Sequence, residues 1–163
     1  MKSALSEDEV LDFAARFLTI KGFRILACGA NQGGLFRFRT NAGRQKAPDL
    51  VAFLDPLLLV CEGKIRSSDL FRKSILRESD YECMLGLARS QKQQIKLEDE
   101  AQRVLRGLGL APPNVISIKV GLIGGTPFAS LTILPPPNEV LFLEIDPSMN
   151  ITVHSDSEGC IPA

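Results

Sequence analysis

The sequence has few of the residues from which most metal and redox sites are built. It contains a single histidine, His154, close to a polar C-terminal tail, and its four cysteines are scattered without a Cys-x-x-Cys pair. Zinc sites need clustered cysteine and histidine ligands, so this pattern excludes a zinc-ligand spacing. The simple interpretation is that the cysteines are reduced thiols in a cytoplasmic protein, three of them within or beside apolar runs.

The chain also lacks a long apolar run, a net charge and a nucleotide-binding loop. No segment approaches ~18 consecutive apolar residues, which argues against a membrane span. The glycine-rich stretch 29–34 lacks the Lys-Ser/Thr ending of a phosphate loop, so no nucleotide cofactor is expected. The 19 basic residues balance 19 acidic ones, and the acidic N-terminal stretch is unlike a signal peptide. Any attraction to nucleic acid therefore has to come from a local cluster of basic residues.

What the sequence does contain is enough apolar material for a folded core. Its length of 163 residues is typical of one domain, and a hydrophobic content of 45% argues against disorder. Two apolar runs, 50–54 and 57–61, are separated by Asp55-Pro56, a turn signal. These runs are predicted to form a hairpin whose strands are buried on both faces. We expect a single domain over residues 1–163.

Two acids and a lysine mark the ends of this hairpin. Asp49 directly precedes the first run, and Glu62, Gly63 and Lys64 directly follow the second. Side chains alternate along a strand, so Glu62 and Lys64 should face one side while Gly63 points away and leaves its carbonyl accessible. Magnesium and manganese prefer oxygen ligands, so Asp49, Glu62 and the Gly63 carbonyl are predicted to bind one of these ions.

This group of residues suits phosphodiester hydrolysis. A bound divalent cation polarises a phosphoryl oxygen and acidifies water, and the ammonium of Lys64 would orient that water or neutralise developing charge. A simpler alternative is that Asp49 caps a turn while Glu62 and Lys64 form a solvated strand end.

Pro48-Asp49, Glu62 and Lys64 together resemble the PD-(D/E)xK signature of the restriction-endonuclease-like nucleases. The gap between Asp49 and Glu62 is similar to that of the archaeal Holliday-junction resolvase branch. The resemblance implies an α/β core over about residues 5–120, made of a helix, a three-stranded meander, a second helix and a further strand. It also implies a metal-dependent endonuclease that cuts DNA, of a junction-specific or restriction type and often a homodimer.

The first helix is predicted from apolar residues that recur at helical spacing between Val10 and Leu18. Ser6 and Glu9 fit a capping box at its start. The resemblance implies an additional metal-side Glu from this helix. Glu7 lies nearer the apolar stripe than Glu9, which already has a capping role, so Glu7 is preferred. For both acids the alternative is a favourable interaction with the helix N-terminus.

Basic residues gather around the acids and are expected to hold the DNA backbone. Salt screens charges beyond ~8 Å at physiological ionic strength, so this local cluster matters more than net charge. The alternative is a solvated edge strand over residues 35–40, protected by its arginines. The predicted DNA-binding residues are Arg37, Arg39, Arg44, Lys46 and Arg66.

The remaining chain is predicted to complete an α/β fold. One helix is expected over residues 70–89, and a second over 97–108 whose start is marked by the acids at 98–100. After Pro112-Pro113, short apolar runs predict strands that form a C-terminal β extension over about residues 121–155. An exposed β segment within 115–153 would offer an interface for a homodimer. The four predicted strands are 115–123, 128–134, 140–145 and 151–153.

Two other functions stay open at this point. The chain could be a non-catalytic nucleic-acid-binding or assembly module that retains the nuclease fold. It could also be an unrelated globular protein in which the motif arose by chance. Stabilisation of the fold by magnesium or manganese would separate these possibilities, because a ligand that binds the native state stabilises it by mass action.

Overall fold

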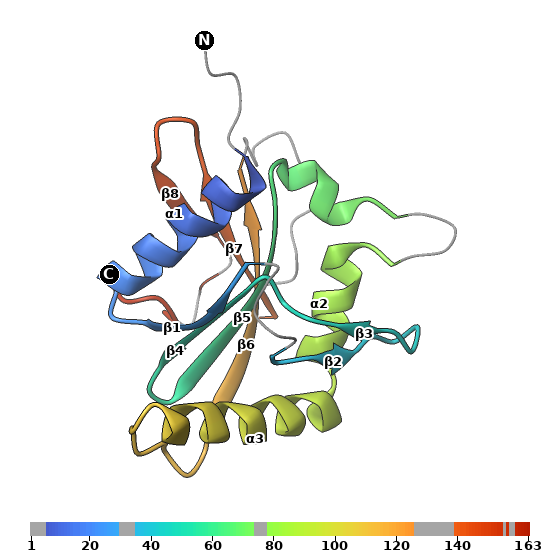
Figure 1. The fold of residues 1–163 in the computed structure, drawn as a ribbon. Helices are drawn as coiled ribbons and strands as arrows, with labels where there is room; N and C mark the ends of the chain where they lie inside the picture. Colours follow the sequence, from blue (N-terminus) through green and yellow to red (C-terminus); the bar gives the residue numbers. More distant parts are fainter. Residues whose placement is uncertain (1–5, 30–34, 74–77, 126–138, 155, 157–158) are drawn as a thin grey trace.

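A six-stranded mixed sheet forms the centre of the computed structural model (Figure 1). The structure describes all residues except 1–5, 30–34, 74–77, 126–138, 155 and 157–158. The strand order is β1-β4-β5-β6-β7-β8, and a separate hairpin is formed by β2 and β3. The strands of the sheet are β1 (Arg24–Cys28), β4 (Leu50–Leu54), β5 (Leu57–Lys64), β6 (Ser117–Gly124), β7 (Val140–Ile145) and β8 (Ile151–His154).

Helices cover both faces of this sheet. Helix α1 packs on one face, and α2, α3 and the short 3-10 helix η1 lie on the other, together with the β2–β3 hairpin (Figure 1). The prediction of an α/β fold is therefore confirmed. The helices are α1 (Glu7–Ile20), η1 (Ser67–Phe71), α2 (Asp80–Ala88) and α3 (Gln91–Gly107), and the hairpin strands are β2 (Phe38–Arg39) and β3 (Gln45–Lys46).

The β4–β5 hairpin is largely buried. Residues on β5 alternate between the two cores: Leu58 and Val60 face α2 and α3, whereas Leu59 and Cys61 face α1. All four side chains are fully buried. The predicted hairpin is thus confirmed, and β5 extends through Lys64, so that Glu62, Gly63 and Lys64 belong to the strand itself.

Strands β6, β7 and β8 extend the sheet beyond β5, as the predicted C-terminal extension required. Strand β6 runs parallel to β5, β7 runs parallel to β6, and β8 returns antiparallel. In segment 115–153, the described strands β6 and β7 lie inside the sheet, so neither offers an exposed edge for the predicted homodimer interface. Within that segment, β8 is the described strand at the sheet edge.

Two helix boundaries were also predicted wrongly. Residues 70–89 do not form one helix: η1 ends at Phe71, Arg72 is extended, and α2 begins only at Asp80. Helix α3 starts at Gln91 instead of near residue 97, because Ser90 caps it. Of the predicted strand 35–40, the structure forms only Phe38–Arg39. The predicted strand 128–134 lies outside the described residues.

The acids at 98–100, predicted to mark the start of a helix, lie in the middle of α3, and two of them bind backbone N–H groups. Glu98 accepts a hydrogen bond from the Ile116 N–H, and Glu100 accepts one from the Phe36 N–H. These bonds fasten the approaches to β6 and β2 onto α3. In the part of the chain that the structure describes, no helix is long and apolar enough to span a bilayer.

Gly125→Ala tests the close approach of three elements behind the site. A Cβ at this position would lie 2.5 Å from the Ile65 carbonyl oxygen and 2.6 Å from Val10 Cγ2. We expect this substitution to lower the free energy of unfolding by about 1–3 kcal/mol, as overpacking does, measured by urea denaturation.

Gly107→Ala is the matched control. No heavy atom lies within 4 Å of a Cβ at that helical position, so this variant should be as stable as wild type or gain up to about 1 kcal/mol. Equal stability of both variants would contradict the packing described.

Candidate functional site

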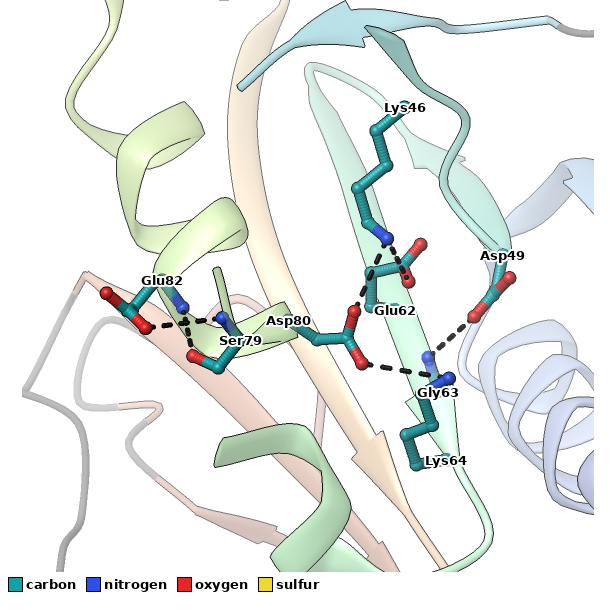
Figure 2. A network of polar contacts seen from close by, with 8 residues as sticks. All are labelled: Lys46, Asp49, Glu62, Gly63, Lys64, Ser79, Asp80 and Glu82. Carbon is teal, nitrogen blue, oxygen red and sulfur yellow. Dashed lines mark hydrogen bonds and ion pairs between the residues drawn. The ribbon is translucent and has the colours of Figure 1, made fainter. Parts of the chain in front are cut away.

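Asp49 is held at the entrance of β4 by three hydrogen bonds. Its backbone N–H donates to the Cys61 carbonyl at 3.0 Å, and its carbonyl accepts from the Gly29 N–H at 2.8 Å. The Gly63 N–H donates to Asp49 Oδ2 at 3.0 Å. The carboxylate is thereby directed at the end of β5, as the hairpin spacing predicted, and Figure 2 shows this contact.

Strand alternation divides the three motif residues between the two faces of the sheet. Glu62 and Lys64 lie on the same face as Val60, toward α2, whereas Gly63 packs against Leu11 of α1. The Lys64 carbonyl accepts from the Gly125 N–H on the β6 side. Because successive carbonyls of a strand point to opposite edges, the Gly63 carbonyl faces the edge where Asp49 lies.

Glu62 is the most deeply buried charged residue of the site, with 3% of its surface exposed. Its Oε2 atom lies 3.1 Å from Lys46 Nζ. Its Oε1 atom is buried and has no hydrogen-bond partner among the described residues. Leaving a buried acceptor unpaired costs about 1–3 kcal/mol, and more if it is charged. A cation or a hydrogen-bond donor next to this oxygen would therefore stabilise the site.

Asp80, at the start of α2, completes the cluster and was missed in the sequence. Its Oδ1 atom lies 3.3 Å from Lys46 Nζ, and its Oδ2 atom lies 3.8 Å from Lys64 Nζ. In Figure 2, Asp80 and Asp49 lie on opposite sides of Glu62, and Lys46 reaches Glu62 from above. The missed signal was the spacing of Ser79 and Glu82, which form a capping box that begins α2 at Asp80.

Burial and mutual repulsion shift the acidity of these groups. Burial, reinforced by Asp49, raises the pKa of Glu62 to about 8, and Lys46 opposes this shift. Burial also raises the pKa of Asp49, opposed by the Gly63 hydrogen bond and reinforced by Glu7. Burial by itself would lower the pKa of Lys46, but the carboxylates of Glu62 and Asp80 outweigh it and raise the pKa.

The two candidate acids of α1 have different surroundings. Glu9 accepts a hydrogen bond from the Ser6 N–H, and its own N–H donates to Ser6 Oγ, so the predicted capping box is confirmed. Glu7 begins the helix and acts on the pKa of Asp49 through its charge. The charge of Glu7 therefore reaches Asp49, as a metal-side acid from this helix would require.

The basic residues predicted to bind DNA lie in different environments. Arg37, Arg39 and Arg44 are exposed on the β2–β3 hairpin and its approach, which Phe38 anchors in the core. Arg66 is also exposed and lies 3.4 Å from Asp69. Lys46 differs from the others, because its side chain is only 20% exposed and is engaged by Glu62 and Asp80.

A cavity of about 400 Å³ opens on the α2 side, next to Lys46, Lys64 and Asp80. Its walls carry four basic side chains, Arg44, Lys46, Lys64 and Arg72, and three acidic ones, Asp69, Glu78 and Asp80. The cavity joins the hairpin, the end of β5 and the start of α2. Both lysines of the cluster are therefore reachable from it by a ligand.

The described residues contain no group of three or more His, Cys, Asp or Glu side chains arranged to hold a metal. A site here would consist of two carboxylates, Asp49 and Glu62, with the Gly63 carbonyl. No model of a known protein family matches the chain, and no curated protein matches it.

Glu62→Gln tests the burial of an ionisable group through the pH dependence of stability. In the unfolded chain a Glu has a pKa of about 4.3, whereas in the native protein burial raises that of Glu62 to about 8. Between these values the native state holds a proton that the unfolded state has released. The free energy of unfolding of wild type should therefore fall as pH rises from about 5 to about 8.

The Gln variant lacks this titration, so its stability relative to wild type should rise over that range by on the order of 2 kcal/mol. The measurement is urea unfolding with a chelator present. Asp99→Asn, at an exposed position on α3, is the control. Parallel stability curves for wild type and Glu62→Gln would contradict the buried environment of Glu62.

Proposed function

We propose that this protein is a metal-dependent nuclease that hydrolyses phosphodiester bonds in DNA and has a restriction-endonuclease-like core. The single observation that carries the proposal is the buried Glu62 oxygen that lacks a hydrogen-bond partner among the described residues, next to Asp49 and two positions from Lys64. The chain order of α1, the meander β1-β4-β5, the helical segment and β6 supports it, because this is the order expected for that core.

The residues present fit a magnesium or manganese ion. Glu62 Oε1, a carboxylate oxygen of Asp49 and the Gly63 carbonyl are all hard oxygen donors, which these ions prefer. Such an ion would satisfy the unpaired Glu62 oxygen and offset the repulsion between the two carboxylates. When bound, it supplies Lewis-acid polarisation of the phosphoryl oxygen and acidifies a water molecule.

The chain's own residues supply orientation and charge. Lys64 extends from the same face as Glu62, and its ammonium neutralises charge that develops on the phosphate or orients the attacking water. Glu7 adds negative charge next to Asp49. The cavity beside the lysines admits the scissile phosphate, and the exposed arginines of the β2–β3 hairpin contact the flanking backbone.

A second candidate function is a non-catalytic nucleic-acid-binding module. The contact of Lys46 with Glu62 favours it, because an ammonium already neutralises one of the two proposed ligands. A site without catalytic function would nevertheless have no physical reason to bury Glu62 with one oxygen unpaired, since that arrangement lowers the stability of the fold. Cleavage assays separate the two functions: this module would bind DNA and leave it intact.

Asp49→Asn and Lys64→Ala test the nuclease directly. We expect wild type to cut supercoiled plasmid or a synthetic four-way junction in magnesium or manganese. Each variant should lower the cleavage rate at least about 100-fold, the usual effect of losing one group that stabilises a transition state. The measurement is a time course of substrate loss on gels, with circular dichroism to show that each variant folds.

Asp99→Asn and Lys92→Ala are matched controls, because they remove the same charges at exposed positions of α3. Both should cut as wild type does. Wild-type protein that binds DNA but never cuts it would favour the non-catalytic module, and cleavage that survives both site substitutions would place the chemistry elsewhere.

Arg37→Ala and Arg44→Ala test the role of the hairpin region. Removing one phosphate contact should weaken DNA binding at all sequences and reduce the slope of log K against log salt by roughly 1. Binding is measured by fluorescence anisotropy in calcium, over a series of salt concentrations. An unchanged slope in both variants would remove these arginines from the DNA interface.

A further inference from the structure

Lys46 occupies an unusual position for a surface-strand lysine. It leaves β3 and reaches between two carboxylates, 3.1 Å from Glu62 Oε2 and 3.3 Å from Asp80 Oδ1 (Figure 2). Only 20% of its side chain is exposed, compared with 38% for Lys64. A buried ammonium loses hydration, so it stays in place only where carboxylates replace the lost water. The position of the Lys46 ammonium therefore depends on its ion pairs with these two acids.

Glu62 and Asp80 form different ion pairs with the two lysines. Among the described residues, the ammonium in ion-pair contact with Glu62 is that of Lys46. Lys64 lies 3.8 Å from the other oxygen of Asp80 and forms no described ion pair with Glu62. Asp80 therefore has one oxygen for each lysine, and it offers Lys46 a second partner if Glu62 becomes engaged by another cation.

We propose that Lys46 is an internal counter-ion of the site, which occupies Glu62 while no divalent cation is bound and withdraws to Asp80 when one binds. This inference rests on the proposed metal site and assigns Lys46 a task other than DNA contact. Lys46 competes with the metal for one carboxylate, and Asp80 is a positioning residue that sets how easily Lys46 leaves.

The competition follows from charge and distance. A divalent ion held by Asp49 and Glu62 would lie close to the Lys46 ammonium, and like charges around one carboxylate repel. When Lys46 leaves Glu62, it keeps its ion pair with Asp80, because that contact does not depend on Glu62. Without Lys46, metal-free Glu62 would face Asp49 and Asp80 without an ion-pair partner, which would make the empty site less stable.

The test is manganese binding to wild type, Lys46→Gln, Lys64→Gln and Asp80→Asn, measured by titration calorimetry at one pH. Lys46→Gln should tighten binding about tenfold, within the usual range for coupling between two sites. Lys64→Gln removes the same charge from the cluster without freeing Glu62, so it should change affinity less than about threefold. Asp80→Asn leaves Lys46 with Glu62 as its remaining partner and should weaken binding.

Opposite signs for Lys46→Gln and Asp80→Asn, with little change in Lys64→Gln, support the proposal. Equal tightening by both lysine substitutions would overturn it, because general electrostatics would then suffice. If Lys46→Gln does not fold, the sign of Asp80→Asn decides, and unchanged or tighter binding overturns the proposal. Asp80→Asn in a Lys46→Gln background should have little effect if Asp80 acts through Lys46.

Plasmid cleavage by the same samples keeps this inference distinct from the proposed function. If the variants show the expected manganese affinities but no sample cuts plasmid, the counter-ion role of Lys46 is supported and the proposed nuclease function is overturned. Cleavage by wild type with affinities that do not differ between variants would retain the nuclease and sink the counter-ion. Failure of wild type to bind manganese would overturn both.

Discussion

Burial of one carboxylate in the middle of a six-stranded sheet is the constraint on which the rest of the site depends. Glu62 lies on β5 opposite Leu122 of β6, with one oxygen paired and the other unpaired among the described residues. A hydrophobic side chain at this position would make the native state more stable, since buried polar groups without full pairing destabilise it. The arrangement is understandable if the position is kept for binding.

The elements around Glu62 are organised to tolerate this burial. Helices α1 and α2 cover opposite faces of the sheet, and each has Ser and Glu in a capping box at its first turn. Acids at helix starts are favoured by the partial positive charge of the helix end. The helix ends therefore favour the positions of Asp80 beside Lys46 and of Glu7 near Asp49.

Local patterns in the sequence predicted the part of the site that is close along the chain. The apolar runs around Asp55-Pro56 fixed the hairpin, and the hairpin brought Asp49 to the Gly63 N–H. The position of Asp80 was missed because a single helix was predicted over 70–89, across the start of α2. The capping box at Ser79 was a readable sign of that boundary. The partners of Lys46 were not readable, because such pairing depends on how α2 docks against β5.

The fold core was predictable to a similar extent and for a similar reason. Periodicity located α1, the hairpin and the last two strands, since each has a clear apolar pattern of its own. It did not reveal that β6 and β7 are internal strands, because parallel pairing joins residues as distant as Leu57 and Ser117. Nor did it predict that Glu98 and Glu100 fasten loops to α3, a role decided by tertiary packing.

Strand β5 also places core packing toward α1 and the proposed site on opposite faces of the sheet, which bears on how the protein can evolve. Leu59 and Cys61 pack toward α1, whereas Glu62 and Lys64 face α2, so substitutions can accumulate in the first layer without touching the second. Gly63 is the exception, because it packs against Leu11 while its N–H holds Asp49. A substitution at Gly63 would therefore disturb both the packing against α1 and the position of Asp49. We expect this residue to tolerate fewer substitutions than its neighbours on the strand.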